Sequence, residues 1–232
     1  PVLTCVATSI PLLRKGVKII WGDIGFNLNL DIEDVKKKIT KKTKAIIFVH
    51  FGGNNEGLLE VIEIARKYRI PVIEDAAQAV GSKIWGIADF TAVSLQAIKT
   101  LTSGDGGFLI CNKRKNYEKA KRLRWFGYDR EKKREDSDLK EAGYKYHMNN
   151  ISAAIGLGNL RSIDKIIKHR KKLMQLYKDA GLNGGIWFCY GLTKKREELF
   201  KEAKKNGIEL GIHHYRNDKY TIFGGRNKLP MM

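Results

Sequence analysis

The sequence has little cysteine and no long apolar run. Its 232 residues include three cysteines, Cys5, Cys111 and Cys189, and no two of them form a CxxC pair. An odd, scattered set of thiols argues against a disulfide framework and a zinc cluster, and it favours a reduced, cytoplasmic protein. Because no apolar stretch approaches the length that spans a bilayer, we expect no membrane segment.

Targeting features are missing from the start of the chain. Residues 1–9 have neither the basic start nor the long apolar core of a signal peptide. They also lack an initiator methionine, so we expect the chain to begin inside a longer protein.

Acidic residues are scarce relative to basic ones. The 25 Asp and Glu against 44 Lys and Arg give a formal net charge of +19. This balance raises nucleic-acid binding as one class of function. The basic residues are dispersed, however, and no zinc finger, RNA-recognition signature or aromatic-basic platform accompanies them. We therefore favour a lysine-rich solvated surface that suits anionic small substrates, with nucleic acid as a remote alternative.

Strand-like and helical patterns alternate along the chain. The strand-like runs are residues 17–21, 45–50, 71–75, 90–94 and 107–111, and the helical patterns are residues 32–39, 58–68 and 116–125. This alternation is the pattern of a parallel sheet with crossover helices, so we predict an α/β fold. In such sheets ligands bind at the carboxyl ends of the strands.

Three parts are expected along the chain. Residues 1–150 are predicted to form a large domain, and residues 151–180 one long linking helix capped by Asn150. Residues 181–232 are predicted to form a small, partial α+β domain, with strands near 186–190 and 208–212 and a helix near 195–205.

Lys99 lies between two predicted strands, just before the glycine-rich turn Gly104-Asp-Gly-Gly107. A lysine with a lowered pKa can act as an amine nucleophile or a Schiff-base partner, whereas the simpler interpretation is a surface lysine before a turn. Hydroxyl groups and glycine amides around it could cradle a phosphate, although most such turns are only turns. These groups belong to Ser94, Thr102, Ser103, Gly104, Gly106 and Gly107.

Asp75 ends the predicted strand 71–75 and is followed by Ala76-Ala77-Gln78. Small alanines let a flat group lie close to the backbone, and a carboxylate can pair with a ring nitrogen and stabilise its protonated form. The alternatives are a helix cap or a partner for a nearby lysine, and for Gln78 a simple surface position. The adjacent His213 and His214 are expected to point apart on a strand, and we predict no metal site.

Several of these stretches together resemble the DegT/StrS-type sugar aminotransferases, which are pyridoxal 5′-phosphate (PLP) enzymes of the aspartate aminotransferase fold, fold type I. The resemblance implies a mainly parallel central sheet with helices on both faces and a small C-terminal α+β domain. The matching stretches cover nearly the whole chain: 43–50, 72–79, 89–90, 94–99, 104–107, 123–127, 143–150 and 214–218.

The resemblance implies a role for each matching residue. Lys99 would form the Schiff base with PLP and shuttle the proton, Asp75 would bind the pyridine nitrogen, and Gln78 would lie against the ring. Ser94 would bind the phosphate, and Lys145 would reach the phosphate of a neighbouring subunit. His214, Arg216 and Asn217 would lie near the sugar-nucleotide site.

The implied reaction moves an amino group from an amino acid, usually glutamate, to a nucleotide-linked keto sugar, with a 4-keto-6-deoxy sugar preferred. We expect a cytoplasmic homodimer with a shared active site. Family members carry a phosphate-binding turn ahead of the position of Pro1. The chain is therefore expected to be either part of a longer protein or a genuine truncation. In the second case it would be a non-catalytic regulator or partner.

Overall fold

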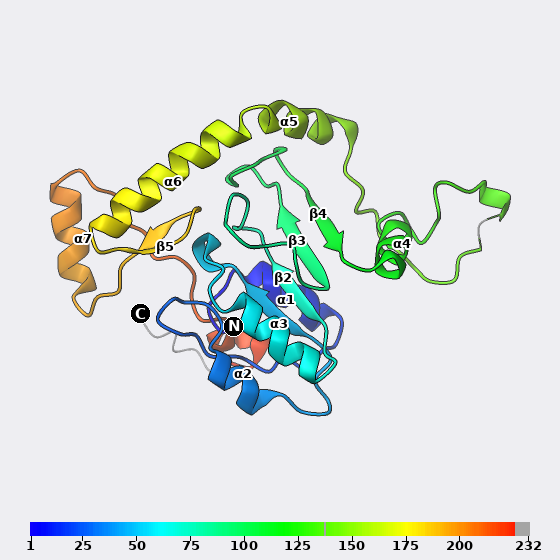
Figure 1. Ribbon diagram of the computed structural model, residues 1–232, viewed down its shortest axis with the longest axis horizontal. Helices are drawn as coiled ribbons and strands as arrows, with labels where there is room; N and C mark the ends of the chain where they lie inside the picture. The colour runs from blue at the N-terminus through cyan, green and yellow to red at the C-terminus, as the bar shows by residue number, and fades with distance from the viewer. Residues whose placement is uncertain (137, 226–232) are drawn as a thin grey trace.

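The computed structural model describes residues 1–136 and 138–225, and a four-stranded sheet lies at its centre (Figure 1). The strands follow one another in the order β1 (Ile46–Val49), β2 (Val72–Asp75), β3 (Phe90–Ser94) and β4 (Gly107–Cys111). β1, β2 and β3 are parallel, whereas β4 runs antiparallel to β3. The predicted α/β class and these four strands are confirmed.

Seven α-helices and a short two-stranded ribbon account for most of the other regular secondary structure in the described residues. The helices are α1 (Val6–Arg14), α2 (Ile32–Lys38), α3 (Leu58–Lys67), α4 (Arg114–Leu123), α5 (Asn150–Leu160), α6 (Ile163–Asp179) and α7 (Arg196–Lys205). The ribbon pairs β5 (Asn183–Gly184) with β6 (Cys189–Tyr190). Short 3-10 helices cover Phe51–Gly53, Arg134–Asp136, Asn217–Lys219 and Thr221–Phe223.

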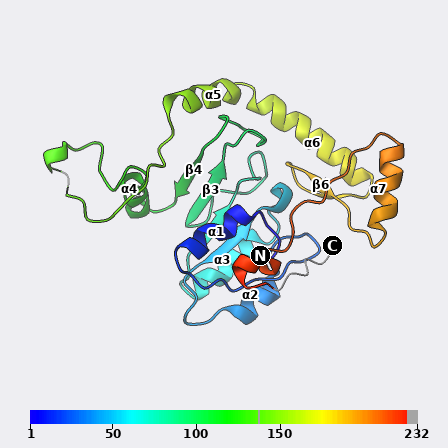
Figure 2. The ribbon, with the colours of Figure 1, turned by 180° about the vertical axis from the view of Figure 1, so that it is seen from behind.

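The main core lies between α3 and the sheet. Leu58 and Val61 of α3 are fully buried and belong to the same cluster as Phe48 of β1 and Val72 of β2. α1 lies on the opposite face of the sheet, as the front and back views show (Figures 1 and 2). The sheet is therefore covered on both sides near its β1–β2 edge, which explains the continuous apolar character of β1.

Local capping accounts for two helix starts. Asp31 caps α2 as predicted, since its carboxylate accepts a hydrogen bond of 2.7 Å from the Asp34 amide. At α5 the cap is Asn149 rather than Asn150, and its side chain accepts from the Ser152 amide at 2.9 Å. Both contacts satisfy amides that have no partner within the helix.

Three expectations of secondary structure are wrong. Residues 17–21 form no strand, because no neighbouring strand pairs with them in the described part of the chain, and Val17 and Ile20 are exposed. The helix expected over 151–180 is broken between α5 and α6 at Arg161 and Ser162. Residues 208–212 are likewise unpaired, and Ile208 is 56% exposed. The division into three domains stays a prediction.

Outlying elements extend from the sheet on two sides. α4 and the segment after it project past β4, while α5 and α6 run above β3 and β4 toward β5, β6 and α7 (Figures 1 and 2). The side chain of Asn159 in α5 donates a 3.0 Å hydrogen bond to the carbonyl of Thr102. This contact ties the helical arm to the loop between β3 and β4. Within the described ranges, no helix is both long and apolar enough to cross a membrane.

Candidate active site

The carboxyl ends of β2 and β3 form the edge that holds three of the predicted site residues, Asp75, Ser94 and Lys99. Asp75 is the last residue of β2 and is paired in register with Ala92 of β3. Ser94 ends β3 two residues further on, and Lys99 follows in the loop that leads to β4. Parallel strands bring these ends to one side of the sheet, where α/β proteins bind ligands.

The carboxylate of Asp75 is held in place by two donors. Its Oδ2 accepts a 2.6 Å hydrogen bond from the hydroxyl of Thr8, and its Oδ1 accepts from the amide of Ala77 at 3.1 Å. Thr8 lies in α1, a helix that the sequence interpretation missed. Pro11 lies inside this helix, although a proline ordinarily predicts the end of a helix because it has no amide hydrogen to donate.

The loop from β3 to β4 is a tightly bonded frame around Lys99. The amide of Leu95 donates to the carbonyl of Gly106, and the amide of Ser103 donates to the carbonyl of Leu95, both at 2.9 Å. Gly107 closes the frame where only glycine fits, since a Cβ there would stand 2.3 Å from the carbonyl oxygen of Val93. This bonding limits the positions that the Lys99 backbone can adopt.

The expectation that the glycine turn cradles a phosphate is not supported by its hydrogen bonds. The amide of Gly104 donates to the Thr102 hydroxyl at 2.9 Å, and the amide of Gly106 donates to Asp105 Oδ1 at 2.8 Å. The Ser103 hydroxyl donates to the carbonyl of Asp105 at 2.7 Å. These groups stabilise the turn itself, and Gly107 belongs to β4.

Ser94 differs from the turn residues in its hydrogen bonding. Its Oγ accepts a 3.3 Å hydrogen bond from the amide of Gln96. This bond leaves the hydroxyl hydrogen of Ser94 able to donate to an anion at the strand end.

The side chain of Lys99 is half-buried beside an aromatic ring. Its Nζ lies 4.2 Å from the ring centroid of Trp187. Burial lowers the pKa of the Lys99 amine, and electrostatic interactions with Asp75 and Cys5 oppose that effect. A lysine with a lowered pKa has a larger fraction of the neutral, nucleophilic amine at neutral pH.

Gln78 and two alanines line the chain just after Asp75. Gln78 is 7% exposed, and its Oε1 accepts a 2.6 Å hydrogen bond from the amide of Gly52. Ala76 and Ala79 are fully buried. The side-chain amide of Gln78 is therefore held by the backbone of Gly52, in the 3-10 helix after β1. Gln78 is not a simple surface residue.

An aromatic cluster lies beside Lys99 and contacts it through Trp187. We give this name to Phe51, Trp187, Phe188, Tyr190, His213 and His214, whose rings contact one another. The expectation that His213 and His214 point apart is wrong, because their ring centroids are 4.0 Å apart and no strand forms there. His214 instead has a positive φ of 61°.

The two histidines of the aromatic cluster favour the neutral form. Burial lowers the pKa of His214 to about 4, with smaller contributions from His213 and Lys99. Burial and the charge of Lys99 also lower the pKa of His213. At neutral pH, His214 therefore adds no positive charge beside the lysine.

Glu74 and His50 form a buried polar network directly behind the edge. Both side chains are fully buried, and His50 Nε2 lies 2.8 Å from Glu74 Oε2. Glu74 also accepts from the amides of Gly86, Ile87 and Ala88 at 2.9, 2.8 and 2.6 Å, and from the hydroxyl of Thr91 at 3.1 Å. The sequence interpretation assigned Glu74 no role, although a charged residue at a buried position of a strand was a usable signal.

A comparison with protein-family models matches residues 1–221 to the DegT/DnrJ/EryC1/StrS aminotransferase family. The chain belongs to this family. The resemblance read from the motifs is thereby confirmed, and family membership agrees with the α/β fold and the lysine loop described above.

Individual relatives of this aminotransferase-family chain are nucleotide-sugar enzymes by name. It is 32% identical to the UDP-4-amino-4,6-dideoxy-N-acetyl-beta-L-altrosamine transaminase of Campylobacter jejuni, over 95% of this chain and 66% of that protein. It is 30% identical to the GDP-perosamine synthase of Vibrio cholerae, over 100% of this chain and 66% of that protein. The chain thus spans about two thirds of the length of these relatives.

A solved structure shares the fold of this family member over nearly its whole length. The sugar aminotransferase CalS13 from Micromonospora echinospora matches with a TM-score of 0.89 and 29% sequence identity. The match covers 99% of this chain and 70% of CalS13. The predicted fold class is therefore confirmed.

Three residues that the family resemblance singled out lie outside the contacts around Lys99. Lys145 is exposed and forms a β-bridge with Trp125. Arg216 is engaged by Asp218 through bonds of 3.1 and 2.9 Å, which raise the pKa of its guanidinium. Asn217 is fully buried, and its side-chain amide donates to Ser9 Oγ at 3.0 Å. Their substrate or partner contacts stay predictions.

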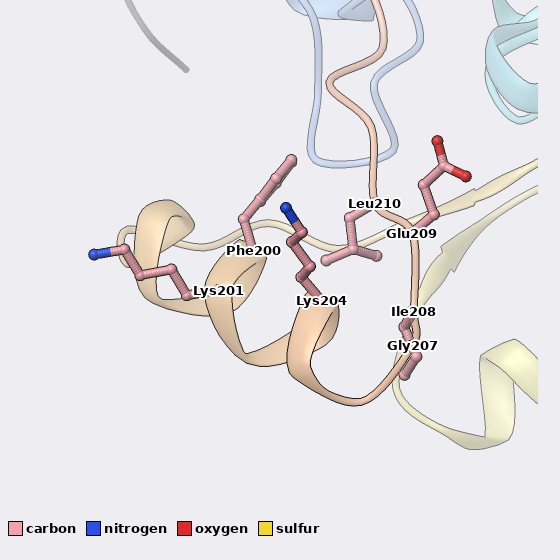
Figure 3. A pocket seen from close by; sticks show the side chains of 7 residues that line it. All are labelled: Phe200, Lys201, Lys204, Gly207, Ile208, Glu209 and Leu210. Atoms are coloured by element: carbon pink, nitrogen blue, oxygen red, sulfur yellow. The ribbon is translucent and has the colours of Figure 1, made fainter.

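Two hollows lie in the C-terminal part of this family member. One of about 320 Å³ opens beside the aromatic cluster and is lined by Trp187, Phe188, Cys189, Gly211, Ile212 and His213. The other, of about 420 Å³, lies between α7 and residues 207–210, with Phe200 and Lys204 among its lining residues (Figure 3). The first shares residues with the Lys99 surroundings, whereas the second does not. The described residues contain no cluster of three or more metal-ligating side chains.

Proposed function

We propose that the protein is a PLP-dependent aminotransferase that moves an amino group from an amino acid to a nucleotide-linked keto sugar. The observation that carries this proposal is the placement of Lys99. Its amine has a pKa lowered by burial, within the electrostatic influence of the strand-end carboxylate of Asp75. Family membership over residues 1–221 supports the same reaction class.

The residues at the edge fit PLP chemically. When bound, PLP supplies a protonated pyridine ring that withdraws electrons from the substrate carbon. The Asp75 carboxylate, held by Thr8 and Ala77, would keep the proton on the ring nitrogen. The Nζ of Lys99 would join covalently to the cofactor and then carry the proton to and from the substrate carbon.

Two further side chains would complete the cofactor contacts. The hydroxyl of Ser94 would donate to the phosphate, and the fixed amide of Gln78 would lie against the ring. The small, buried Ala76 and Ala79 allow a flat ring to approach the backbone after β2. Lys145 would contribute to the phosphate site of a neighbouring subunit.

For the substrates we propose glutamate as the donor and a nucleotide-linked 4-keto-6-deoxy sugar as the acceptor. The nucleotide-sugar activities named for the Campylobacter jejuni and Vibrio cholerae relatives support this class of acceptor. The net charge of +19 suits a nucleotide diphosphate. Arg216, Asn217 and His214 would lie near the acceptor. A panel of UDP-, GDP- and dTDP-linked 4-keto-6-deoxy sugars, with amino-sugar formation followed by mass spectrometry, tests the acceptor.

We also propose a homodimer in the cytoplasm. α5 supports the dimer, because its apolar side chains are left largely uncovered. Ile151, Leu157 and Leu160 are 77%, 64% and 47% exposed. Monomeric proteins rarely leave large apolar patches exposed, and a second copy of the chain would cover these side chains.

The decisive experiment locates covalent attachment of PLP. The full-length protein is incubated with PLP, reduced with borohydride, digested and analysed by peptide mass spectrometry. We expect the reduced adduct on Lys99 and its loss in Lys99→Met. Lys83→Met is the matched control, since Lys83 is an exposed lysine on the loop after β2. An adduct that persists in Lys99→Met refutes the residue assignment. No adduct in either protein supports the non-catalytic alternative.

A further inference from the structure

The tip of the β5–β6 ribbon is bonded to the 3-10 helix Phe51–Gly53, which follows β1. The amide of Trp187 donates to the carbonyl of Gly52 at 2.9 Å, and Arg170 of α6 donates to the carbonyl of Trp187 at 3.2 Å. Gly185 packs so closely that a Cβ there would stand 2.5 Å from the carbonyl carbon of Gly53. Ile186 is 5% exposed. The backbone that carries Trp187 is therefore fixed relative to the sheet.

The Trp187 side chain reaches from this tip to the Lys99 loop. Its indole Nε1 donates a 3.4 Å hydrogen bond to the carbonyl of Ile98, the residue before Lys99. Its ring centroid lies 4.2 Å from Lys99 Nζ. The indole also contacts the rings of Phe188 and His213, whose centroids lie 5.4 and 5.5 Å from its own. The indole therefore contacts both the backbone of the loop and the amine.

We propose that Trp187 is a positioning residue for Lys99: its ring binds the Nζ group and fixes where the amine stands at the strand-end edge. The face of an indole ring carries negative charge density and attracts an ammonium group. The attraction acts on the charged form only, so Trp187 holds Lys99 most strongly while the amine is protonated. The contact between Trp187 and Lys99 does not depend on the proposed function. Its effect on catalysis does rest on the proposed function.

Two effects of Trp187 on the amine oppose each other. The π-face favours the ammonium, whereas the bulk of the indole excludes water and favours the neutral amine. A cation–π contact at a partly exposed site corresponds to about 0.4–0.7 pKa unit. Four other titratable groups interact electrostatically with Lys99. They are Asp75 at the end of β2, Cys5 before α1, and His213 and His214 of the aromatic cluster. These groups stay unchanged when only Trp187 is replaced.

A comparison of two replacements separates the effects. Trp187→Phe keeps an aromatic face, and Trp187→Leu keeps an apolar side chain of similar size without that face. The cofactor-free protein is labelled with trace acetic anhydride over a pH series, and the Lys99 peptide is quantified by mass spectrometry. The reactivity midpoint of Lys99 is expected to lie about 0.4–0.7 pH unit lower in the Leu variant than in the Phe variant.

Controls keep this test independent of folding and of activity. Trp125→Leu is the matched variant, because Trp125 contacts Arg130 at 4.8 Å instead of Lys99; its Lys99 midpoint should equal that of the unaltered protein. Thermal melting followed by circular dichroism checks each fold, and Trp187→Met replaces the Leu variant if the latter melts early.

The outcomes are distinct. Equal midpoints in the Phe and Leu variants, or a higher midpoint in the Leu variant, overturn the inference. If the midpoints are ordered as expected but PLP forms no adduct with Lys99, the inference holds and the proposed function fails.

Discussion

Glu74 offers a direct test of how the candidate site is supported. We predict that Glu74→Gln destabilises the protein and removes part of its acid sensitivity. The carboxylate is fully buried and accepts hydrogen bonds from three backbone amides and the Thr91 hydroxyl, beside the imidazole of His50. Glutamine has the same shape but no charge, and its amide group can donate where Glu74 only accepts.

The size of the effect follows from the pKa of Glu74. Burial alone would raise it, but the hydrogen bonds from His50, Ala88 and Gly86 lower it from 4.5 to about 2. That difference corresponds to about 3 kcal/mol of folding free energy at neutral pH. Because the folded-state pKa is depressed, this contribution is present above pH 4.5 and is lost as the pH falls toward 2.

Urea unfolding at several pH values, monitored by circular dichroism, measures this contribution. At pH 7 we expect Glu74→Gln to lose about 2–3 kcal/mol, since one glutamine oxygen can still accept backbone hydrogen bonds. The stability difference between the two proteins should shrink as the pH falls below 4.5. Glu60→Gln is the control, because Glu60 is exposed on α3. A loss below about 1 kcal/mol at pH 7, or a difference that stays constant down to pH 3, would refute the reasoning.

Three other changes test separate parts of the structure. Gly107→Ala should lower the melting temperature, with a destabilisation of about 1–3 kcal/mol, because the new Cβ would stand 2.3 Å from the Val93 carbonyl oxygen; an unchanged melt contradicts this. Leu157→Asp on α5 should shift the protein from dimer to monomer in light scattering after size exclusion, and a dimer that persists argues for another interface. Asp75→Asn should weaken PLP binding at least tenfold in an absorbance titration, and an unchanged affinity would remove Asp75 from the cofactor site.

Local patterns in the sequence predicted the central part of the fold. β3 and β4 form over the predicted residues; β1 is one residue shorter than predicted at each end, and β2 begins one residue later. These strands are short apolar runs bounded by breaks, so neighbouring residues determine them. The edge that holds Asp75, Ser94 and Lys99 follows from the strand order alone, because parallel strands end on one side.

Contacts between distant segments could not be predicted in the same way. Thr8 lies 67 residues before Asp75, and Trp187 lies 89 residues after Ile98, whose carbonyl it binds. No periodicity links such positions. The packing of His213 against His214 was missed for a related reason: the predicted alternation required a strand, but the backbone turns at His214 with a φ of 61°.

The dipeptide Glu74-Asp75 shows why the end of β2 can both stabilise the sheet and present a functional group. Consecutive residues of a strand face opposite sides of the sheet. Glu74 points to the side of α3 and binds the backbone around Ala88, while Asp75 points to the side of α1 and meets Thr8. A register slip of one residue would exchange the faces on which the two carboxylates lie, so that Glu74 would face α1 in place of Asp75. The network around Glu74 therefore stabilises the register in which Asp75 faces α1 and accepts from Thr8.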